Sequence, residues 1–351
     1  MGISDVTESL ESVDVVILTA LHEEHAAVVQ ALGDCSEHRW RGHVLRVGSV
    51  GNLRVLAFSM GSMGNVGSAQ SAALVISAWN PAYILLVGIA GGAAQDSDDL
   101  QLGDVLVPDQ VIGYEPGKVF PGRLERRYEV YRPDHVLLHT AQGLAPQNWA
   151  LGAAIMRPDG RGDRVIPRAH FGPVFSGEKV LADPFTVNLL KADWPKAIGV
   201  EMESLGVALA AYRGGPGFFM AKAVCDFADT AKGDDWHAYA ASVAAHFSIA
   251  TLRAVSLEVS ANRPQAVPVN VPASYPGVVK VHVCQRLHFE WQDVADDFGV
   301  PLHIKARFEK GNESRNLWEW LESRGKLPLL PAALGRYGRD DLAQFMRENA
   351  A

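Results

Sequence analysis

Hydrophobic patterns typical of strands and of helices alternate along the first 256 residues. The apolar run Val13–Leu18 predicts a buried strand, and the run from about Leu21 to Leu32 has the spacing of a helix. Further strands are predicted over residues 43–50, 53–60, 83–87, 104–107, 198–202 and 218–224, and further helices over 68–79, 134–145, 183–192, 204–212 and 237–256. The rest of 113–169 and residues 174–177 are predicted to form loops. This alternation indicates an α/β fold in which helices flank both faces of a mixed, mostly parallel central sheet.

The pattern changes in the last quarter of the chain. Residues 257–281 are rich in proline and have no helical period, which is typical of a semi-extended linker. Residues 282–351 have apolar positions three and four apart, which predicts a small all-α bundle of five or six short helices. Trp318 and Trp320 are two positions apart and cannot share one helix face, so we expect one in the core and one at the surface. The expected domains are therefore 1–256 and 282–351.

Composition narrows the class of protein. Apolar residues make up 48% and charged residues 21%, and the net charge of −8 argues against a nucleic-acid partner. Three widely separated cysteines predict neither a disulfide framework nor a zinc site, and we expect no metal or cofactor. The acidic N-terminal segment is unlike a signal peptide, and no apolar run has the ~18 residues of a membrane span. We expect a cytoplasmic protein with no membrane contact.

Three acidic residues follow predicted strands, where ligands of parallel sheets bind. Glu24 lies in the first turn after the first strand, Glu203 follows residues 198–202, and Asp226 follows residues 218–224. Each acid alone has a structural explanation, since acids favour helix N-termini and cap helices. Together they suit N-glycosidic cleavage of a purine nucleoside. That reaction needs an acid for the base, a carboxylate for the ribose hydroxyls and a base for water.

Seven motifs carry a family resemblance over residues 13–255. They are TALHEE, GSMGNVGSA, LLVGIAGG, LGDVLVP, SGEKV, VEMES and KAVCDFAD, in this order. The chain resembles the nucleoside phosphorylase/nucleosidase superfamily, which includes methylthioadenosine/S-adenosylhomocysteine nucleosidases. The resemblance implies a nucleoside phosphorylase-like fold and a purine nucleosidase, an N-glycosyl hydrolase. The exact substrate stays open among methylthioadenosine, adenosine, ATP and related compounds.

The resemblance also implies roles for individual residues. Glu24 matches the carboxylate that activates water, Asp226 the acid that serves purine N7, and Glu203 the acceptor of the ribose hydroxyls. Met202 matches the residue that packs on the sugar. Other residues implied to line the substrate site are Glu201, Val180, Leu181, Ile89, Ala90, Gly91 and Lys222.

One strand distinguishes two reactions. Hexameric phosphorylases have an arginine that binds phosphate where this chain has Val87, and Ile89 replaces a hydroxyl residue. A phosphate dianion needs charge-assisted donors, so we expect water as the nucleophile. His22, Lys222 or an arginine of residues 123–132 could supply the missing charge. Two alternatives remain open: a phosphate-dependent purine nucleoside phosphorylase and a non-catalytic sensor of a purine ligand.

The C-terminal helices resemble the death-fold family and the bacterial effector-associated domains similar to it. The pattern runs from EWQDVADDFGV through LWEWLESRGKL to LPAALGRYGRDDLAQFM. The resemblance implies a protein partner, recruited through complementary charged faces. It also implies coupling of the enzyme to a signalling or antiviral defence complex that depletes a nucleotide pool. From the catalytic domain, the resemblance implies a homo-oligomer. The alternative is a purely structural role, in which these helices form a cap packed on the catalytic domain.

Overall fold

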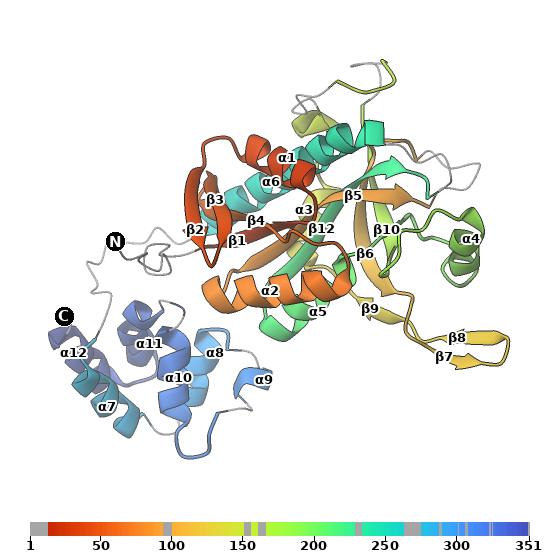
Figure 1. Cartoon of the computed structure of the whole chain (residues 1–351). Coiled ribbons are helices and arrows are strands. Elements are labelled where there is room, and N and C mark those ends of the chain that lie inside the picture. The colour runs from red at the N-terminus through yellow and green to blue at the C-terminus, as the bar shows by residue number, and fades with distance from the viewer. Residues whose placement is uncertain are drawn as a thin grey trace. The chain divides into compact units, whose positions relative to one another are not determined.

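The computed structural model describes residues 13–93, 100–150, 156–160, 166–228, 234–262, 275–287, 290–300, 302–305, 308–322, 324 and 326–349. The chain divides into two compact units, Met1–Arg263 and Pro264–Ala351. Figure 1 shows the elements of both units. No helix of the described residues has the length and apolarity needed to cross a bilayer.

A ten-stranded sheet forms the centre of the first unit. Its strands are β1 (Val15–Thr19), β2 (Ser36–Trp40), β3 (His43–Val50), β4 (Leu53–Ser59), β5 (Tyr83–Gly92), β6 (Val105–Gly113), β9 (Glu129–Tyr131), β10 (Ala169–Ser176), β11 (Gly199–Glu201) and β12 (Gly217–Asp226). The order is β11-β10-β6-β12-β5-β1-β4-β3-β2, with β9 beside β6. Strands β4, β1, β5 and β12 are parallel neighbours, as are β6, β10 and β11. The predicted α/β class with a mixed central sheet is confirmed.

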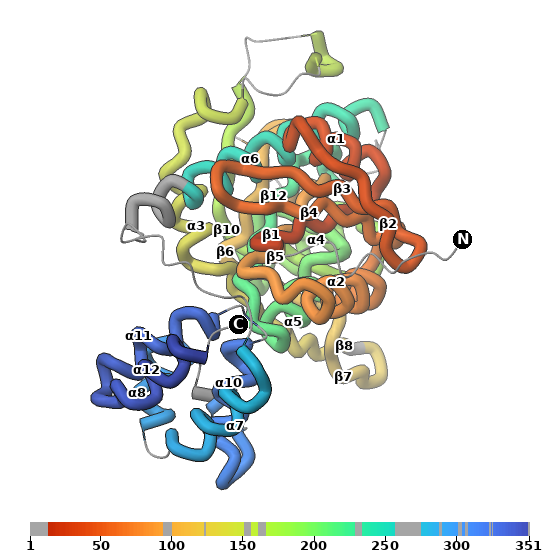
Figure 2. Tube along the Cα trace, turned by 90° about the vertical axis from the view of Figure 1, so that its left-hand side faces the viewer, coloured from red at the N-terminus to blue at the C-terminus, as the bar shows by residue number. Residues whose placement is uncertain are grey.

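Helices cover both faces of this sheet. Helices α1 (His22–Leu32), α3 (His135–Gln142) and α6 (His237–Asn262) pack on one face, and α2 (Asn65–Trp79) and α5 (Ser204–Gly214) on the other (Figures 1 and 2). The described residues of the unit also include helix α4 (Pro184–Asp193) and the short 3₁₀ turns Pro146–Asn148 and Asp234–Trp236. Strand β1 shows why two cores form. Val15 and Ile17 join the cluster under α1 and α6, whereas Val16 and Leu18 join the cluster under α2 and α5.

Two of the predicted loop regions were wrong. Residues 174–177 were expected to begin a loop, but residues 174–176 are the last three residues of β10, which pairs with β6 and β11. Gly172 and Pro173 lie inside this strand, where the register shifts and the irregularity accommodates the proline. Residues 113–169 contain β9 and a two-stranded hairpin, β7 (Gly117–Phe120) and β8 (Arg123–Arg126). The hairpin projects from the sheet and buries no apolar face, so its sequence carries no strand alternation (Figure 1).

The second unit is a helical bundle with its own apolar core. Its elements are α7 (Gly277–Arg286), α8 (Trp291–Asp297), α9 (Leu302–Lys305), α10 (Glu313–Glu322), a 3₁₀ turn (Leu327–Leu329), α11 (Leu330–Arg336) and α12 (Asp340–Glu348). The end of α6 and the start of α7 fall inside the predicted linker 257–281, and residues 263–274 lie outside the described residues. Trp318 is buried in the core, while Trp320 is half-buried and stacks against the Arg324 guanidinium.

The two tryptophans of α10 predict different stabilities. Trp318→Ala is expected to lower the free energy of unfolding of the second unit by about 3–5 kcal/mol, the usual effect of removing a buried aromatic side chain. Trp320→Ala, the matched control, is expected to have a smaller effect because that ring is only half-buried. Calorimetry of the full chain measures both. Equal losses in the two variants would contradict the packing described for α10.

Candidate functional site

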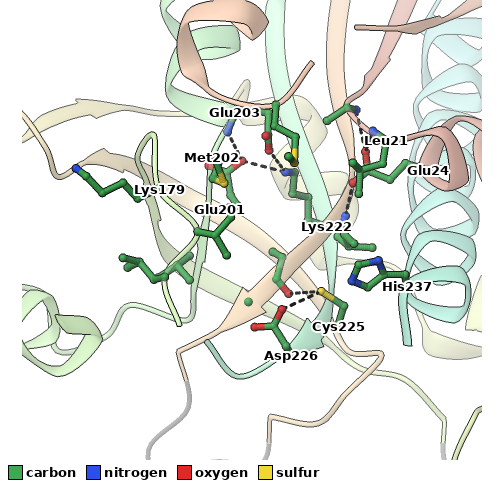
Figure 3. Close-up of a pocket in the computed structure, with 18 of the residues that line it drawn as sticks. Leu21, Glu24, Lys179, Glu201, Met202, Glu203, Lys222, Cys225, Asp226 and His237 are labelled. Carbon is green, nitrogen blue, oxygen red and sulfur yellow. Dashed lines mark hydrogen bonds and ion pairs between the residues drawn. The ribbon is translucent and has the colours of Figure 1, made fainter. Parts of the chain in front are cut away.

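A cavity of about 270 Å³ lies at the carboxyl ends of several strands of the first unit (Figure 3). All eleven residues that the sequence predicted for the site line it. They are Glu24, Ile89, Ala90, Gly91, Val180, Leu181, Glu201, Met202, Glu203, Lys222 and Asp226. The strand order explains this convergence. Strand β5 pairs with β1, β12 and β11, so segments far apart in the sequence end at one place.

Glu24 lies deep in this cavity, with 2% of its surface exposed. One carboxylate oxygen accepts hydrogen bonds from the amides of Ala20 and Leu21, at 2.8 and 2.9 Å, and the other accepts from the Ile89 amide at 2.9 Å. The carboxylate reaches Ile89 because residue 88 is glycine: a Cβ there would lie 2.1 Å from Glu24 Oε1. Burial raises the pKa of Glu24, and the Lys222 ammonium offsets part of the rise.

Lys222 joins two further acids in a buried cluster (Figure 3). Its ammonium donates to Glu203 Oε2 at 2.6 Å and lies 3.1 Å from Glu201 Oε2. The second oxygen of Glu203 accepts from the Gly64 amide at 3.1 Å, at the start of α2. Burial alone would raise the pKa of Glu203, but Lys222 and backbone donors lower it below its ordinary value. Glu203 is therefore an ionised acceptor in a fixed position.

The Glu201 carboxylate accepts more hydrogen bonds from the protein than the Glu203 carboxylate does. It accepts hydrogen bonds from the Glu203 and Ser204 amides and from the Ser204 hydroxyl. Its side chain is 1% exposed. These bonds fix the junction between β11 and α5, where Met202 and Glu203 face the cavity. The geometry favours a positioning role for Glu201 over direct contact with a ligand.

A bulge in β12 aims Asp226 at the cavity. Val224 pairs with Ala90, but Asp226, not Cys225, pairs with Gly91. The Ala228 amide donates to Asp226 Oδ1 at 2.7 Å, and the Cys225 thiol donates to Oδ2 at 3.4 Å. Figure 3 shows Asp226 at the opposite end of the cavity from Glu24 and Glu203. A ligand between these ends would meet acids on both sides.

Sequence reasoning missed several residues that line the cavity. They are Ala20, Leu21, Met63, Lys179, Val200, Cys225, Asp234 and His237. His237 Nδ1 lies 3.1 Å from Glu23 Oε1, although the two residues are 214 positions apart. No local motif in the sequence indicates that these two residues are close. Their contact follows from the packing of α6 beside α1. Among the residues that the structure describes, neither His22 nor the basic residues of 118–132 line this cavity.

Family models match both units. The phosphorylase superfamily model matches residues 14–259, and the model of bacterial death-like domain 3 matches residues 277–349. Both predicted resemblances are confirmed. The linker and domain boundaries predicted from the sequence remain expectations.

Curated relatives of the first unit are nucleosidases. A 5′-methylthioadenosine/S-adenosylhomocysteine nucleosidase of Marinomonas sp. is 26% identical over 216 residues, which are 60% of this chain and 85% of that protein. The ATP nucleosidase Cap17 of Escherichia coli is 27% identical over 261 residues, 67% of this chain, but the chain spans only 50% of Cap17.

Solved structures agree on the fold. A Streptococcus pneumoniae methylthioadenosine/S-adenosylhomocysteine nucleosidase with a transition-state inhibitor has a TM-score of 0.58 at 21% identity, covering 69% of this chain and 99% of that one. Helicobacter pylori futalosine hydrolase has a TM-score of 0.55 at 19% identity, covering 70% and 99%. The family model covers more than half of the chain, and the chain belongs to the phosphorylase superfamily.

Proposed function

We propose that the first unit hydrolyses the N-glycosidic bond of a purine nucleoside or nucleotide, releasing the free base and the ribose moiety. One observation carries the proposal: Glu24, Glu203 and Asp226 line one cavity, with Asp226 across it from the other two. Nucleosidase activity is also the function of the curated relatives. Hydrolysis of the N-glycosidic bond needs only these three acids and water.

The acids divide the reaction between them. Asp226 donates a proton or hydrogen bond to purine N7 as the C1′–N9 bond breaks and its electrons pass to the base. Glu203 accepts hydrogen bonds from the ribose hydroxyls as positive charge develops on the sugar. Glu24 takes a proton from the water that attacks C1′. Met202 packs on the sugar, and residues 180–181 line the base.

Lys222 favours water over phosphate as the nucleophile. Its ammonium is already bonded to Glu203 and paired with Glu201, at 2.6 and 3.1 Å. Residues 87 and 89 are Val and Ile, which offer no side-chain donor. A phosphate dianion placed there would meet Glu24 and Glu203, and Lys179, the other lysine among the described residues that line the cavity, is paired with Glu115 at 2.6 Å. A phosphorylase is therefore the less favoured alternative.

The test is release of free base from a panel of purine nucleosides and nucleotides, including methylthioadenosine, adenosine and ATP. The proposal expects release at equal rates with and without inorganic phosphate. Release only with phosphate, with ribose 1-phosphate as product, would establish the phosphorylase alternative. Tight binding of adenine without turnover of any panel member would establish the sensor alternative.

The assignment of Glu24 as general base predicts the pH dependence. Burial raises the pKa of Glu24 above the ordinary value of 4.5, so the base becomes protonated, and inactive, at a higher pH than an exposed glutamate would. We expect kcat/KM to fall with decreasing pH along a limb centred above 4.5. A pH-rate profile measured where the protein stays folded checks this. A rate that stays constant down to that pH would contradict the assignment.

Gly88→Ala tests whether turnover depends on the position of the Glu24 carboxylate. The added methyl group would lie 2.1 Å from Glu24 Oε1 and would displace the carboxylate from the Ile89 amide. We expect kcat to fall by about 10²-fold or more, the lower range for losing a general base. Gly143→Ala is the matched control, because its methyl group would meet nothing closer than 3.5 Å. Turnover equal to the wild type in Gly88→Ala would separate Glu24 from the chemistry.

The second unit is proposed to recruit a protein partner. Its match to a death-like domain supports this, as do the charged residues on and beside α8, which are Asp293, Asp296 paired with Lys305, and Asp297 paired with Arg336. We propose that the partner belongs to a signalling or defence complex. A homo-oligomer through the first unit is proposed from exposed apolar side chains beside the cavity, Met63 and Val66 being 56% and 76% exposed. Light scattering of the full chain tests the oligomer.

A further inference from the structure

We propose that Glu115 is a positioning residue that fixes the loop of residues 177–182 on the base side of the cavity. The inference rests on the proposed function, because it assigns this loop to the purine. Glu115 lies between the end of β6 and the β7–β8 hairpin and does not line the cavity itself. It acts through two successive residues of the loop, Glu178 and Lys179.

The Glu115 carboxylate uses both of its oxygens on the loop. Oε2 accepts from the Glu178 amide at 3.0 Å, and Oε1 accepts from the Lys179 ammonium at 2.6 Å. The Glu115 side chain is 25% exposed, whereas the Lys179 side chain is 73% exposed. Both bonds are exposed to solvent, but the bond to the Glu178 amide holds the main chain directly and therefore contributes more to the position of the loop than the ion pair does.

Neighbouring contacts give the loop a defined start. Gly177 lies against the Tyr114 ring, where a Cβ would be 2.3 Å from Tyr114 Cζ, and its amide donates to the Glu201 carbonyl at 3.1 Å. The Glu178 side chain accepts from the Val66 amide at 3.1 Å, in the first turn of α2. Tyr114 and Glu115 thus form a seat under residues 177–179.

Apolar packing holds the next residues only in part, through Leu181, which packs against the cluster that includes Tyr114 and Phe175. Val180, which lines the cavity, is 59% exposed, and Leu181 is half-buried. Beyond them the chain is fixed again where Asp183 accepts from the Phe185 and Thr186 amides and caps α4. Residues 180–181 therefore span two polar anchors, one of which is Glu115. Loss of Glu115 removes two of the polar contacts that hold one end of this segment, those to Glu178 and Lys179.

The acids of the reaction lie on other elements, which predicts a distinctive kinetic result. Glu24 is on α1, Glu203 precedes α5 and Asp226 ends β12. Glu115→Ala is expected to raise KM about 5- to 20-fold while kcat stays within about twofold, since ground-state contacts to the base are lost and the reacting groups stay in place. A residue that only stabilised the fold would not separate KM from kcat.

Three further variants sharpen the test. Glu115→Gln keeps an oxygen for the Glu178 amide and is expected to restore most of the affinity; it also serves if Glu115→Ala does not fold. Lys179→Met removes the exposed ion pair but leaves the bond to the Glu178 amide, so its effect on KM is expected to be smaller than that of Glu115→Ala. Glu129→Ala removes an exposed acid of β9 and is the matched control.

Adenine binding separates this inference from the proposed function. If the wild-type chain binds adenine but hydrolyses nothing, the proposed hydrolysis fails, and a weaker adenine Kd in Glu115→Ala than in Glu129→Ala still supports the loop assignment. Unchanged KM and adenine Kd in folded Glu115→Ala, or a fall in kcat equal to the rise in KM, would overturn it. A wild-type chain that neither binds adenine nor turns over any nucleoside would overturn both.

Discussion

Asp226→Asn is expected to lower kcat for purine nucleosides by about 10²–10⁴-fold, the contribution usual for a general acid. The amide retains an oxygen for the Ala228 amide, which donates to Asp226 at 2.7 Å, so the thermal midpoint should change little. An asparagine has no acidic proton for purine N7, and the base must leave as an anion. Release of free base, measured beside Asp340→Asn as an exposed control, gives the comparison.

A second substrate shows whether Asp226 acts on the leaving group. The 4-nitrophenolate group of 4-nitrophenyl riboside departs without protonation, so Asp226→Asn should lower the rate of hydrolysis of this substrate by less than about tenfold. Equal losses for both substrates would mean that Asp226 acts through the position of the sugar or the fold. Normal turnover of purine nucleosides by the variant would remove Asp226 from the mechanism.

Lys222→Met is expected to cost about 3–5 kcal/mol of unfolding free energy, because it leaves buried carboxylates without their cation. Burial would lower the pKa of Lys222, but Glu203, Glu201 and Glu24 raise it above its ordinary value, so the cluster contains an ammonium. Turnover should disappear with it, since Glu203 loses the partner at 2.6 Å that fixes it. Denaturant titration measures the stability, and Lys196→Met, an exposed site on the same unit, should change it by less than about 0.5 kcal/mol.

The sign of the pH dependence distinguishes this explanation from lost packing. Lys222 contributes to lowering the pKa of Glu203 below its ordinary value, against the effect of burial, so the attraction stabilises the fold where Glu203 is ionised. As the pH falls through the pKa of folded Glu203, that stabilisation is lost in the wild type. The difference in stability between the wild type and Lys222→Met should therefore shrink at acid pH. A difference that stays constant with pH would indicate packing alone.

The sequence predicted the acids of the site better than their surroundings. Ligands bind at the carboxyl ends of parallel strands, so Glu24, Glu203 and Asp226 could be found from the hydrophobic periodicity and the motifs together. The bulge that pairs Asp226 with Gly91 could not, because a one-residue change of register leaves no signal in hydropathy. Glu115 and Glu178 are 63 positions apart, and a polar contact over that distance follows only from topology.

The errors in the fold have similar causes. Strand β10 contains Gly172 and Pro173, residues that usually mark a loop, and only the pairing with β6 on one side and β11 on the other makes it a strand. The β7–β8 hairpin has no buried face to impose alternation. By contrast, Val15–Leu18 alternates between two cores, and such a strand is readable from its residues alone.

The fate of oxygen from water tests the central claim most directly. In phosphate-free H₂¹⁸O, the wild-type chain should release the base from a purine nucleoside and incorporate one ¹⁸O at C1 of the ribose product, which is reduced at once with borohydride so that C1 does not exchange its oxygen with water. Mass spectrometry of that ribose reads the outcome. Base release that requires phosphate, with no ¹⁸O in the sugar product, would contradict water attack assisted by Glu24.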